Sequence, residues 1–298
     1  MKKSKISDSF YNNGCLLDGE NKNLYDCRQE DILKYFEKYG VIVFRNFKHK
    51  IRNLTAFTDR FTHTYANDAL RRNSRLDNKK IKDVDVGYQK VDLHSEASFS
   101  PAWPEIIWFA CISPSSRASG KTILCDGIKL WERLETSTKK FFLRNQISYK
   151  LKIPYGKPQQ RKGYKDWYLD EPGVRNCKLN LKKGLVELDF SRYAVVKTRI
   201  FNKLSFVNHL IVSLKSENQL FSRKTIDSKI IPVKIMQEIY DKSSSLTYRF
   251  EWQKNDVLMI DNKRFMHGRE KILNKDLRDI INIQTLKSNF GFGYFNYF

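Results

Sequence analysis

The sequence predicts a mostly β protein, an antiparallel-rich sandwich flanked by helices. Apolar, β-branched runs typical of buried strands lie near both ends of the chain, at 41–44, 256–262 and 277–286. Amphipathic helical patterns lie early and in the middle. A chain of 298 residues with 41% hydrophobic residues can bury a sizeable core. No repeat, low-complexity block or linker divides it, which indicates a single domain over 1–298.

Two amphipathic helices are predicted in the first part of the chain, over 30–39 and 54–61. Gly40 suits the end of the first helix, because glycine readily adopts the left-handed conformation found there. The run 41–44 that follows is typical of a buried strand. The apolar residues at helical spacing are Ile32, Phe36, Tyr39, Leu54, Phe57 and Phe61.

Strands are predicted in the middle of the chain at 105–113 ("EIIWFACIS") and 121–126 ("KTILCD"), followed by a helix over 129–145. The segment 155–200 is basic, aromatic and irregular, with few periodic signals. We interpret it as a lid or insert over a pocket. Its cations suit an anionic group on a ligand, such as a carboxylate, sulfonate or phosphonate, but we favour the alternative that they are solvated loop charges.

The formal net charge of +22 has two interpretations. It indicates either a polyanionic partner such as nucleic acid or a compositional bias, since Lys, Asn and Ile are frequent throughout. The basic residues are interspersed with 33 acidic ones, and no nucleic-acid-binding motif is recognisable. We therefore favour a solvated basic surface and expect no specific nucleic-acid partner.

Five scattered cysteines, without a C-x-x-C pair, argue against a disulfide framework and a structural zinc site. The N-terminal segment lacks the apolar run of a signal peptide, and no stretch approaches the length of a membrane span. We therefore expect a cytoplasmic protein that does not associate with membranes. The sequence does not indicate an oligomeric state.

The stretch "VDLHSEASFSPAWP" (91–104) contains His94 and Glu96 two residues apart. On a strand, residues at this spacing point to the same side, so they could hold one ion. His267 follows the predicted strand 256–262 and could add a third ligand. Two histidines and one carboxylate form the iron site of non-haem Fe(II) oxygenases, in which the opposite positions stay open for a cosubstrate and O₂. The alternative without a metal is that the two histidines pack in the core and the glutamate lies on the surface.

Arg278 comes eleven residues after His267, at the start of a predicted strand. A 2-oxoglutarate cosubstrate chelates iron through its keto acid end, and a guanidinium fork suits its distal carboxylate. The hydroxyl of Thr122 could join that carboxylate. Alternatively, Arg278 is an exposed strand residue paired with Asp276 or Asp279, and Thr122 is an ordinary strand residue.

Three segments in the right order resemble the taurine dioxygenase and clavaminate synthase-like (TauD/TfdA) family of Fe(II)/2-oxoglutarate-dependent oxygenases. They are "KYGVIVFRNF", "HSEASFSPAWPEIIWFACISPSSRASGKTILCDG" and "WQKNDVLMIDNKRFMHGRE". The second is similar to the family's H-x-D/E motif with its following strands, and the third to its W-x-x-G-D-hydrophobic-D-N-x-x-x-x-H-G-R segment. Asn255 stands where glycine is usual, and Glu96 replaces the commoner Asp.

The resemblance implies a double-stranded β-helix, a cupin-like jelly roll flanked by helices. It implies that His94, Glu96 and His267 bind Fe(II), and that Thr122 and Arg278 bind 2-oxoglutarate. With O₂, such an enzyme hydroxylates or desaturates a small metabolite and releases succinate and CO₂. The expected substrate is an amino acid or an amino-acid-derived natural-product intermediate, including anionic ones. The residues expected to contact it are Asn208 and Arg269.

Two alternatives remain open: a nucleic-acid oxidative demethylase with the same chemistry, and a non-catalytic, basic nucleic-acid-binding protein on this fold. Other enzyme classes are excluded by missing motifs. A zinc deaminase needs a P-C-x-x-C segment after its H-x-E, and a serine hydrolase of the elbow type needs G-x-S-x-G. The chain contains neither motif, nor a phosphate-binding G-x-x-x-x-G-K-[ST] loop.

Overall fold

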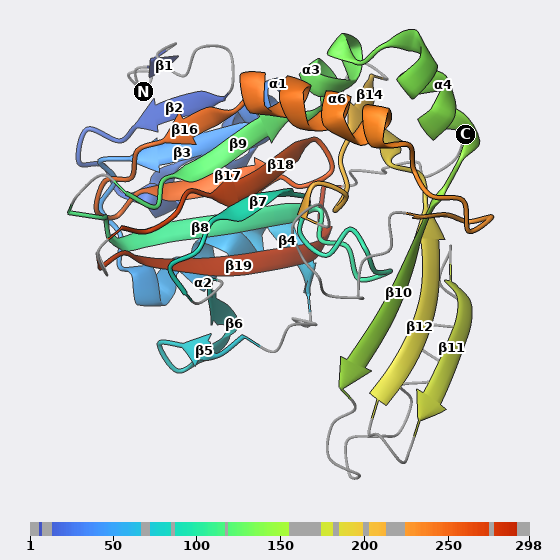
Figure 1. The fold of residues 1–298 in the computed structure, drawn as a ribbon. Coiled ribbons are helices and arrows are strands. Elements are labelled where there is room, and N and C mark those ends of the chain that lie inside the picture. The colour runs from blue at the N-terminus through green and yellow to red at the C-terminus, as the bar shows by residue number, and fades with distance from the viewer. Residues whose placement is uncertain are drawn as a thin grey trace.

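The computed structural model describes residues 6–7, 14–66, 72–84, 87–116, 119–154, 174–180, 185–198, 203–212, 224–273 and 277–290. Figure 1 shows stacked sheets with helices over them, and a group of strands that projects to one side, formed by Ile147–Pro154, Val174–Asn180 and Leu185–Arg192. The predicted jelly roll with flanking helices is confirmed. None of the described helices is both long and apolar enough to cross a membrane.

The larger sheet has nine strands among the described residues, and all its pairings are antiparallel except that between β2 and β3. Sequence neighbours are often not spatial neighbours: β17, from the C-terminal part, lies between β3 and β8. In pairing order the strands are β1 (Ile6–Ser7), β2 (Cys15–Asp18), β3 (Val41–Arg45), β17 (Val257–Asp261), β8 (Ile106–Ser113), β19 (Asp279–Ser288), β6 (Asn78–Asp83) and β5 (Ser74–Arg75), with β4 (Thr62–Tyr65) also paired to β19.

The smaller sheet has four described strands, in the order β16 (Tyr248–Phe250), β9 (Thr122–Asp126), β18 (Phe265–Arg269) and β7 (Val91–His94). It faces the larger sheet across a layer of buried apolar side chains. Val43, Phe109 and Leu258 contribute to this layer from the larger sheet, and Leu124 and Phe265 from the smaller one. This layer holds the two sheets together, because each sheet buries one face against the other.

Helices cover the outer faces of both sheets. The short helices α1 (Gln29–Tyr39) and α2 (Leu54–Thr58) pack on the larger sheet, and Gly40 ends α1 in the left-handed conformation, as predicted. The apolar surface behind the smaller sheet is covered by α3 (Gly127–Arg133), α4 (Thr136–Arg144) and α6 (Val233–Ser245). The described 3₁₀ helices are Leu24–Asp26, Ile51–Asn53 and Asp59–Phe61.

A separate sheet extends beside the jelly roll (Figure 1). Its described strands, in pairing order, are β11 (Val174–Asn180), β12 (Leu185–Arg192), β10 (Ile147–Pro154) and β15 (Lys224–Thr225), and nearby β13 (Val195–Lys197) pairs with β14 (Leu204–Phe206). The segment predicted as an irregular lid, 155–200, therefore contains regular strands, and that part of the prediction is wrong. Its portion 155–173 lies outside the described residues. Along β12, buried apolar residues alternate with less buried ones, two of them acidic, which is the period-two pattern of a half-buried strand.

Two predicted helices are shorter than expected. The helix predicted over 129–145 is divided into α3 and α4. The break is at Leu134, whose backbone is extended and which belongs to neither helix. The helix predicted over 54–61 is α2 followed by a 3₁₀ turn. In both cases the apolar residues at helical spacing are buried. The periodicity therefore indicated the buried face correctly, but the prediction of one continuous helix was wrong.

Gly268 is a residue of β18 at a point where this strand approaches the backbone of β7 closely. A Cβ at this position would lie 2.5 Å from the carbonyl oxygen of Val91 and 3.0 Å from the carbonyl carbon of Asp92, both backbone atoms. We predict that Gly268→Ala forces the strands apart and lowers the free energy of unfolding by about 1–3 kcal/mol, measured by urea denaturation. Leu277→Ala, at a residue that is 81% exposed, is the control and should change it by less than about 0.5 kcal/mol. Equal stability of Gly268→Ala and the parent chain would contradict this account.

Candidate metal centre

Two histidines meet across neighbouring strands of the smaller sheet. His94, the last residue of β7, pairs directly with His267 in the middle of β18. Directly opposed residues of an antiparallel pair project to the same face of a sheet. The two rings therefore lie side by side, with centroids 4.6 Å apart. Strand register thus brings together two ligands from distant parts of the chain.

Glu96 completes the group from the turn after β7. Its Oε2 lies 3.7 Å from Nε2 of His94 and 3.7 Å from Nε2 of His267. The ligand atoms of the three residues all lie within 4.8 Å of one another, and all three residues are buried. Strand alternation was the predicted reason for this proximity, but β7 ends at His94. The turn, in which Ala97 has a φ of 53°, directs the carboxylate instead.

The hydrogen bonding of His94 suits a metal ligand. Its Nδ1 lies 2.9 Å from the backbone carbonyl oxygen of Asp92. A carbonyl oxygen can only accept, so Nδ1 carries the proton and Nε2 presents its lone pair toward Glu96 and His267. Two imidazole nitrogens and one carboxylate oxygen, buried and converging, fit the facial triad of a non-haem Fe(II) site.

The protonation states of the ligands also suit a metal. Burial alone would raise the pKa of Glu96, but the positive charge of Arg72, whose Nη2 lies 3.0 Å from its Oε1, outweighs burial and holds the pKa well below its ordinary value. Burial, reinforced by the neighbouring His94, lowers the pKa of His267. At neutral pH the carboxylate is therefore ionised and His267 is neutral, which are the forms that bind metal ions.

The turn that carries Glu96 is held by the side chain of Asn262. The amide oxygen of Asn262 accepts from the backbone N–H of Glu96 at 2.9 Å, and its amide nitrogen donates to the carbonyl oxygens of Glu96 (3.0 Å) and Pro104 (2.9 Å). The Ser95 hydroxyl donates to the Asn262 carbonyl oxygen at 2.7 Å and accepts from Trp103 Nε1. The sequence reasoning did not assign Asn262 a role, although it stands in the D-N pair of the motif that ends at His267.

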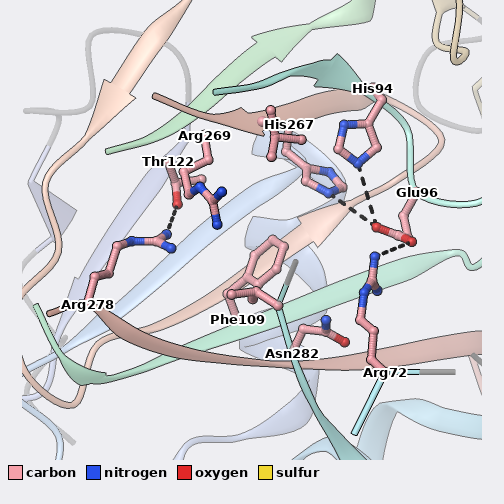
Figure 2. A pocket seen from close by; sticks show the side chains of 12 residues that line it. Arg72, His94, Glu96, Phe109, Thr122, His267, Arg269, Arg278 and Asn282 are labelled. Carbon is pink, nitrogen blue, oxygen red and sulfur yellow. Dashed lines mark hydrogen bonds and ion pairs between the residues drawn. The ribbon is translucent and has the colours of Figure 1, made fainter. Parts of the chain in front are cut away.

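Thr122 and Arg278 lie together at the other end of the same pocket (Figure 2). Arg278 Nη2 donates to Thr122 Oγ1 at 2.9 Å, and Trp252 Nε1 donates to the same oxygen at 2.9 Å. Burial, together with the nearby charge of Arg269, lowers the pKa of Arg278 to about 10. No carboxylate of the described residues forms an ion pair with Arg278 within 4.0 Å. This end of the pocket therefore offers a mostly buried cation to an anionic group.

The two residues expected to contact the substrate have different positions. Arg269 lines the pocket, and its Nη2 donates to the carbonyl oxygens of Gly87 and Gln89 at 2.8 Å each. Asn208 is fully buried and is not among the residues that line the pocket. Its side chain donates to the carbonyl oxygen of Ala194 and accepts from the backbone N–H of Leu210. These two hydrogen bonds support the local backbone. The predicted contact of Asn208 with a substrate stays a prediction.

Arg72 is a further charged residue of the pocket that the sequence reasoning did not single out. Its guanidinium pairs with Glu96 at 3.0 Å. In the sequence it is one of several basic residues in the run 70–83, which resembles a solvated surface. The pocket is completed by an apolar and polar lining made of Val84, Val91, Phe109, Gly268 and Asn282. With Arg269 and Arg278, the described part of the pocket lining contains three arginines and one carboxylate.

A jelly roll that buries two histidines and one carboxylate at one end of a cationic pocket defines a class of mononuclear metal oxygenases. Residues 17–282 match the family described as "Taurine catabolism dioxygenase TauD, TfdA family". The chain belongs to this family of dioxygenases. The order of the motifs had indicated the same family from the sequence.

Similar proteins of known identity agree with this assignment. One is the 3-((Z)-2-isocyanoethenyl)-1H-indole synthase of Fischerella ambigua, 22% identical over 200 residues that make up 66% of this chain and 63% of that protein. The match thus spans less than two thirds of that relative's length. AAD-2, solved with Mn(II) and N-oxalylglycine, has a TM-score of 0.62 at 14% identity, covering 94% of this chain and 96% of that one.

PvcB from Pseudomonas aeruginosa also has this fold. It is described as an Fe, alpha-ketoglutarate dependent oxygenase from an isonitrile synthetic pathway. Its structure has a TM-score of 0.59 at 12% identity and covers 91% of this chain and 85% of that one. At these identities the likeness extends to the fold.

Proposed function

We propose that the protein is an Fe(II)/2-oxoglutarate-dependent dioxygenase that oxidises a small, amino-acid-derived metabolite. The observation that carries the proposal is one pocket with a buried His–Glu–His group at one end and the Thr122–Arg278 pair at the other. A keto acid with a distal carboxylate has the two functional groups that these ends would bind. The family's activity and the ionisation state of the ligands support it.

We assign Fe(II) to His94, Glu96 and His267, and the distal carboxylate of 2-oxoglutarate to Arg278 and Thr122. When bound, iron supplies oxidising chemistry that couples decarboxylation of 2-oxoglutarate, with O₂, to reaction at a substrate C–H bond. The protein positions the reactants and excludes water. The Thr122 hydroxyl and the buried position of Arg278 fix the guanidinium, so the cosubstrate carboxylate would bind in one orientation.

The substrate class is proposed from the charge of the pocket and from the relatives. Among the described residues, three arginines and one carboxylate line the pocket, and this excess of positive charge favours an anionic substrate in addition to an anionic cosubstrate. The Fischerella relative is named for a product with an isocyanoethenyl group, and PvcB for an isonitrile pathway. We therefore propose an amino acid or an amino-acid-derived carboxylate, with desaturation and hydroxylation as the two outcomes. We also propose a single domain over 1–298, with a lid formed around 155–200, in the cytoplasm.

The first prediction concerns the three ligands. Purified chain should bind one Mn(II) or Fe(II) and release succinate from 2-oxoglutarate under air, and His94→Ala, Glu96→Ala and His267→Ala should each abolish both. The reason is that two remaining protein ligands hold the metal weakly and in the wrong geometry. Binding is measured by calorimetry with Mn(II), and turnover by succinate release. His63→Ala, at an exposed histidine, is the control and should retain both. Normal succinate release from any triad variant would remove that residue from the site.

The second prediction concerns Arg278. Arg278→Ala should weaken 2-oxoglutarate binding by several hundredfold or more, because loss of one partner of a buried charge pair costs on the order of 3–5 kcal/mol. Mn(II) binding should change little. Arg278→Lys should restore little affinity, since an ammonium group cannot form the planar fork. An unchanged KM for 2-oxoglutarate would move the anion site elsewhere, with Arg269 as the next candidate.

The third prediction separates the metabolite enzyme from a nucleic-acid demethylase. A methylated oligonucleotide should not stimulate succinate release at 150 mM salt. Nucleic-acid binding should be sequence-independent and should fall steeply with salt, as expected for phosphate contacts alone. Release that is stimulated by the methylated oligonucleotide, and not by its unmethylated counterpart, would favour the demethylase.

A further inference from the structure

Glu96, one of the three residues assigned to the metal, forms an ion pair with an arginine that lies outside the ligand-bearing motifs. Nη2 of Arg72 lies 3.0 Å from Oε1 of Glu96. Both side chains are buried, at 8% and 9% exposure. Arg72 lies just before β5, in a part of the chain separate from every ligand-bearing strand. An ion pair so enclosed is only weakly screened by solvent, and the guanidinium therefore restrains the carboxylate.

The two oxygens of this carboxylate have different surroundings (Figure 2). Oε2 lies 3.7 Å from Nε2 of His94 and 3.7 Å from Nε2 of His267. Oε1 is directed to Arg72. One oxygen thus faces the converging ligand atoms, and the other is turned away from them by a charge-assisted hydrogen bond.

This division has a consequence for metal binding. A carboxylate can bind a metal ion through one oxygen or through both, whereas a facial triad needs each protein residue to occupy a single position. Engagement of Oε1 by Arg72 leaves only Oε2 for the metal. Hydrogen bonds to ligating carboxylates orient them, and their loss typically weakens metal binding 10–100-fold.

We propose that Arg72 is a positioning residue that holds Glu96 as a one-oxygen metal ligand. The inference rests on the proposed function, because it assigns the metal to His94, Glu96 and His267. It adds a residue to the metal centre from outside the motifs that carry the ligands. Arg72 acts through Glu96 and has no metal-binding group of its own.

The test is the affinity of the metal-free chain for Mn(II), measured by calorimetry. Arg72→Met removes the hydrogen bond and the charge, and we expect a 10–100-fold weaker Kd. The alternative, that Arg72 only adds positive charge to the pocket, predicts the opposite sign, because removal of a cation favours binding of another cation. Equal or tighter Mn(II) binding by Arg72→Met would therefore overturn the proposal.

A matched control is available in the larger sheet. Arg45 pairs with the buried Asp256 at 2.6 Å, outside the residues that line the pocket. Arg45→Met breaks a comparable buried pair and should leave the Kd for Mn(II) unchanged. A similar loss in Arg45→Met would mean that general destabilisation explains the effect, and would also overturn the proposal. If Arg72→Met does not fold, Arg72→Gln replaces it, since glutamine is polar but too short to reach Oε1.

A second measurement reports the coordination of the metal. The visible spectrum of the Co(II)-loaded chain depends on the number and arrangement of ligand atoms. We expect its bands to change in Arg72→Met, because both carboxylate oxygens become available, and to remain as in the parent chain in Arg45→Met. An unchanged spectrum in Arg72→Met would contradict the positioning role. If the parent chain itself does not bind Mn(II), the proposed function fails; if it binds and Arg72→Met binds equally well, only this inference fails.

Discussion

The pairing of β7 with β18 is the interaction on which the site depends. Its register sets His94 opposite His267, and it is maintained by the absence of a side chain at Gly268, where the backbone of β7 lies within contact distance. A shift by one residue would turn one histidine to the other face of the sheet. Every other feature of the pocket is arranged around this fixed pair of rings.

Hydrogen bonds convert the irregular turn after β7 into a defined part of the site. A turn has fewer backbone constraints than a strand, so Glu96 would be free to adopt many orientations. The side chain of Asn262 holds the backbone of Glu96, and Arg72 holds the carboxylate of Glu96. The side chain and its backbone are thus restrained by two separate segments, which gives a loop residue the precision of a residue in a regular element.

The sequence predicted the sandwich, its strands and the three ligand candidates because each leaves a local signal. The runs at 41–44 and 256–262 are rich in consecutive apolar residues, which is typical of buried strands, and the ligand candidates stand in motifs that occur in the family's order. Arg72 left no such signal, because a lysine- and arginine-rich run looks the same whether one side chain turns inward or all are solvated. The strands β11 and β12 were missed because they lie within a long basic and aromatic stretch with few other periodic signals, although β12 does alternate apolar and polar residues. Tertiary pairing overrides weak local pattern in such strands.

The hydrogen bonds between Asn262 and the Glu96 turn have a consequence for how the protein is made. They join residues 166 positions apart, and His267 and β19 lie further still along the chain. During synthesis the N-terminal part emerges with His94 and Glu96 but without the strand that completes their group. A ribosome-bound chain would therefore hold no finished metal centre until β18 with His267 had emerged, so the metal can be bound by all three residues only after that point.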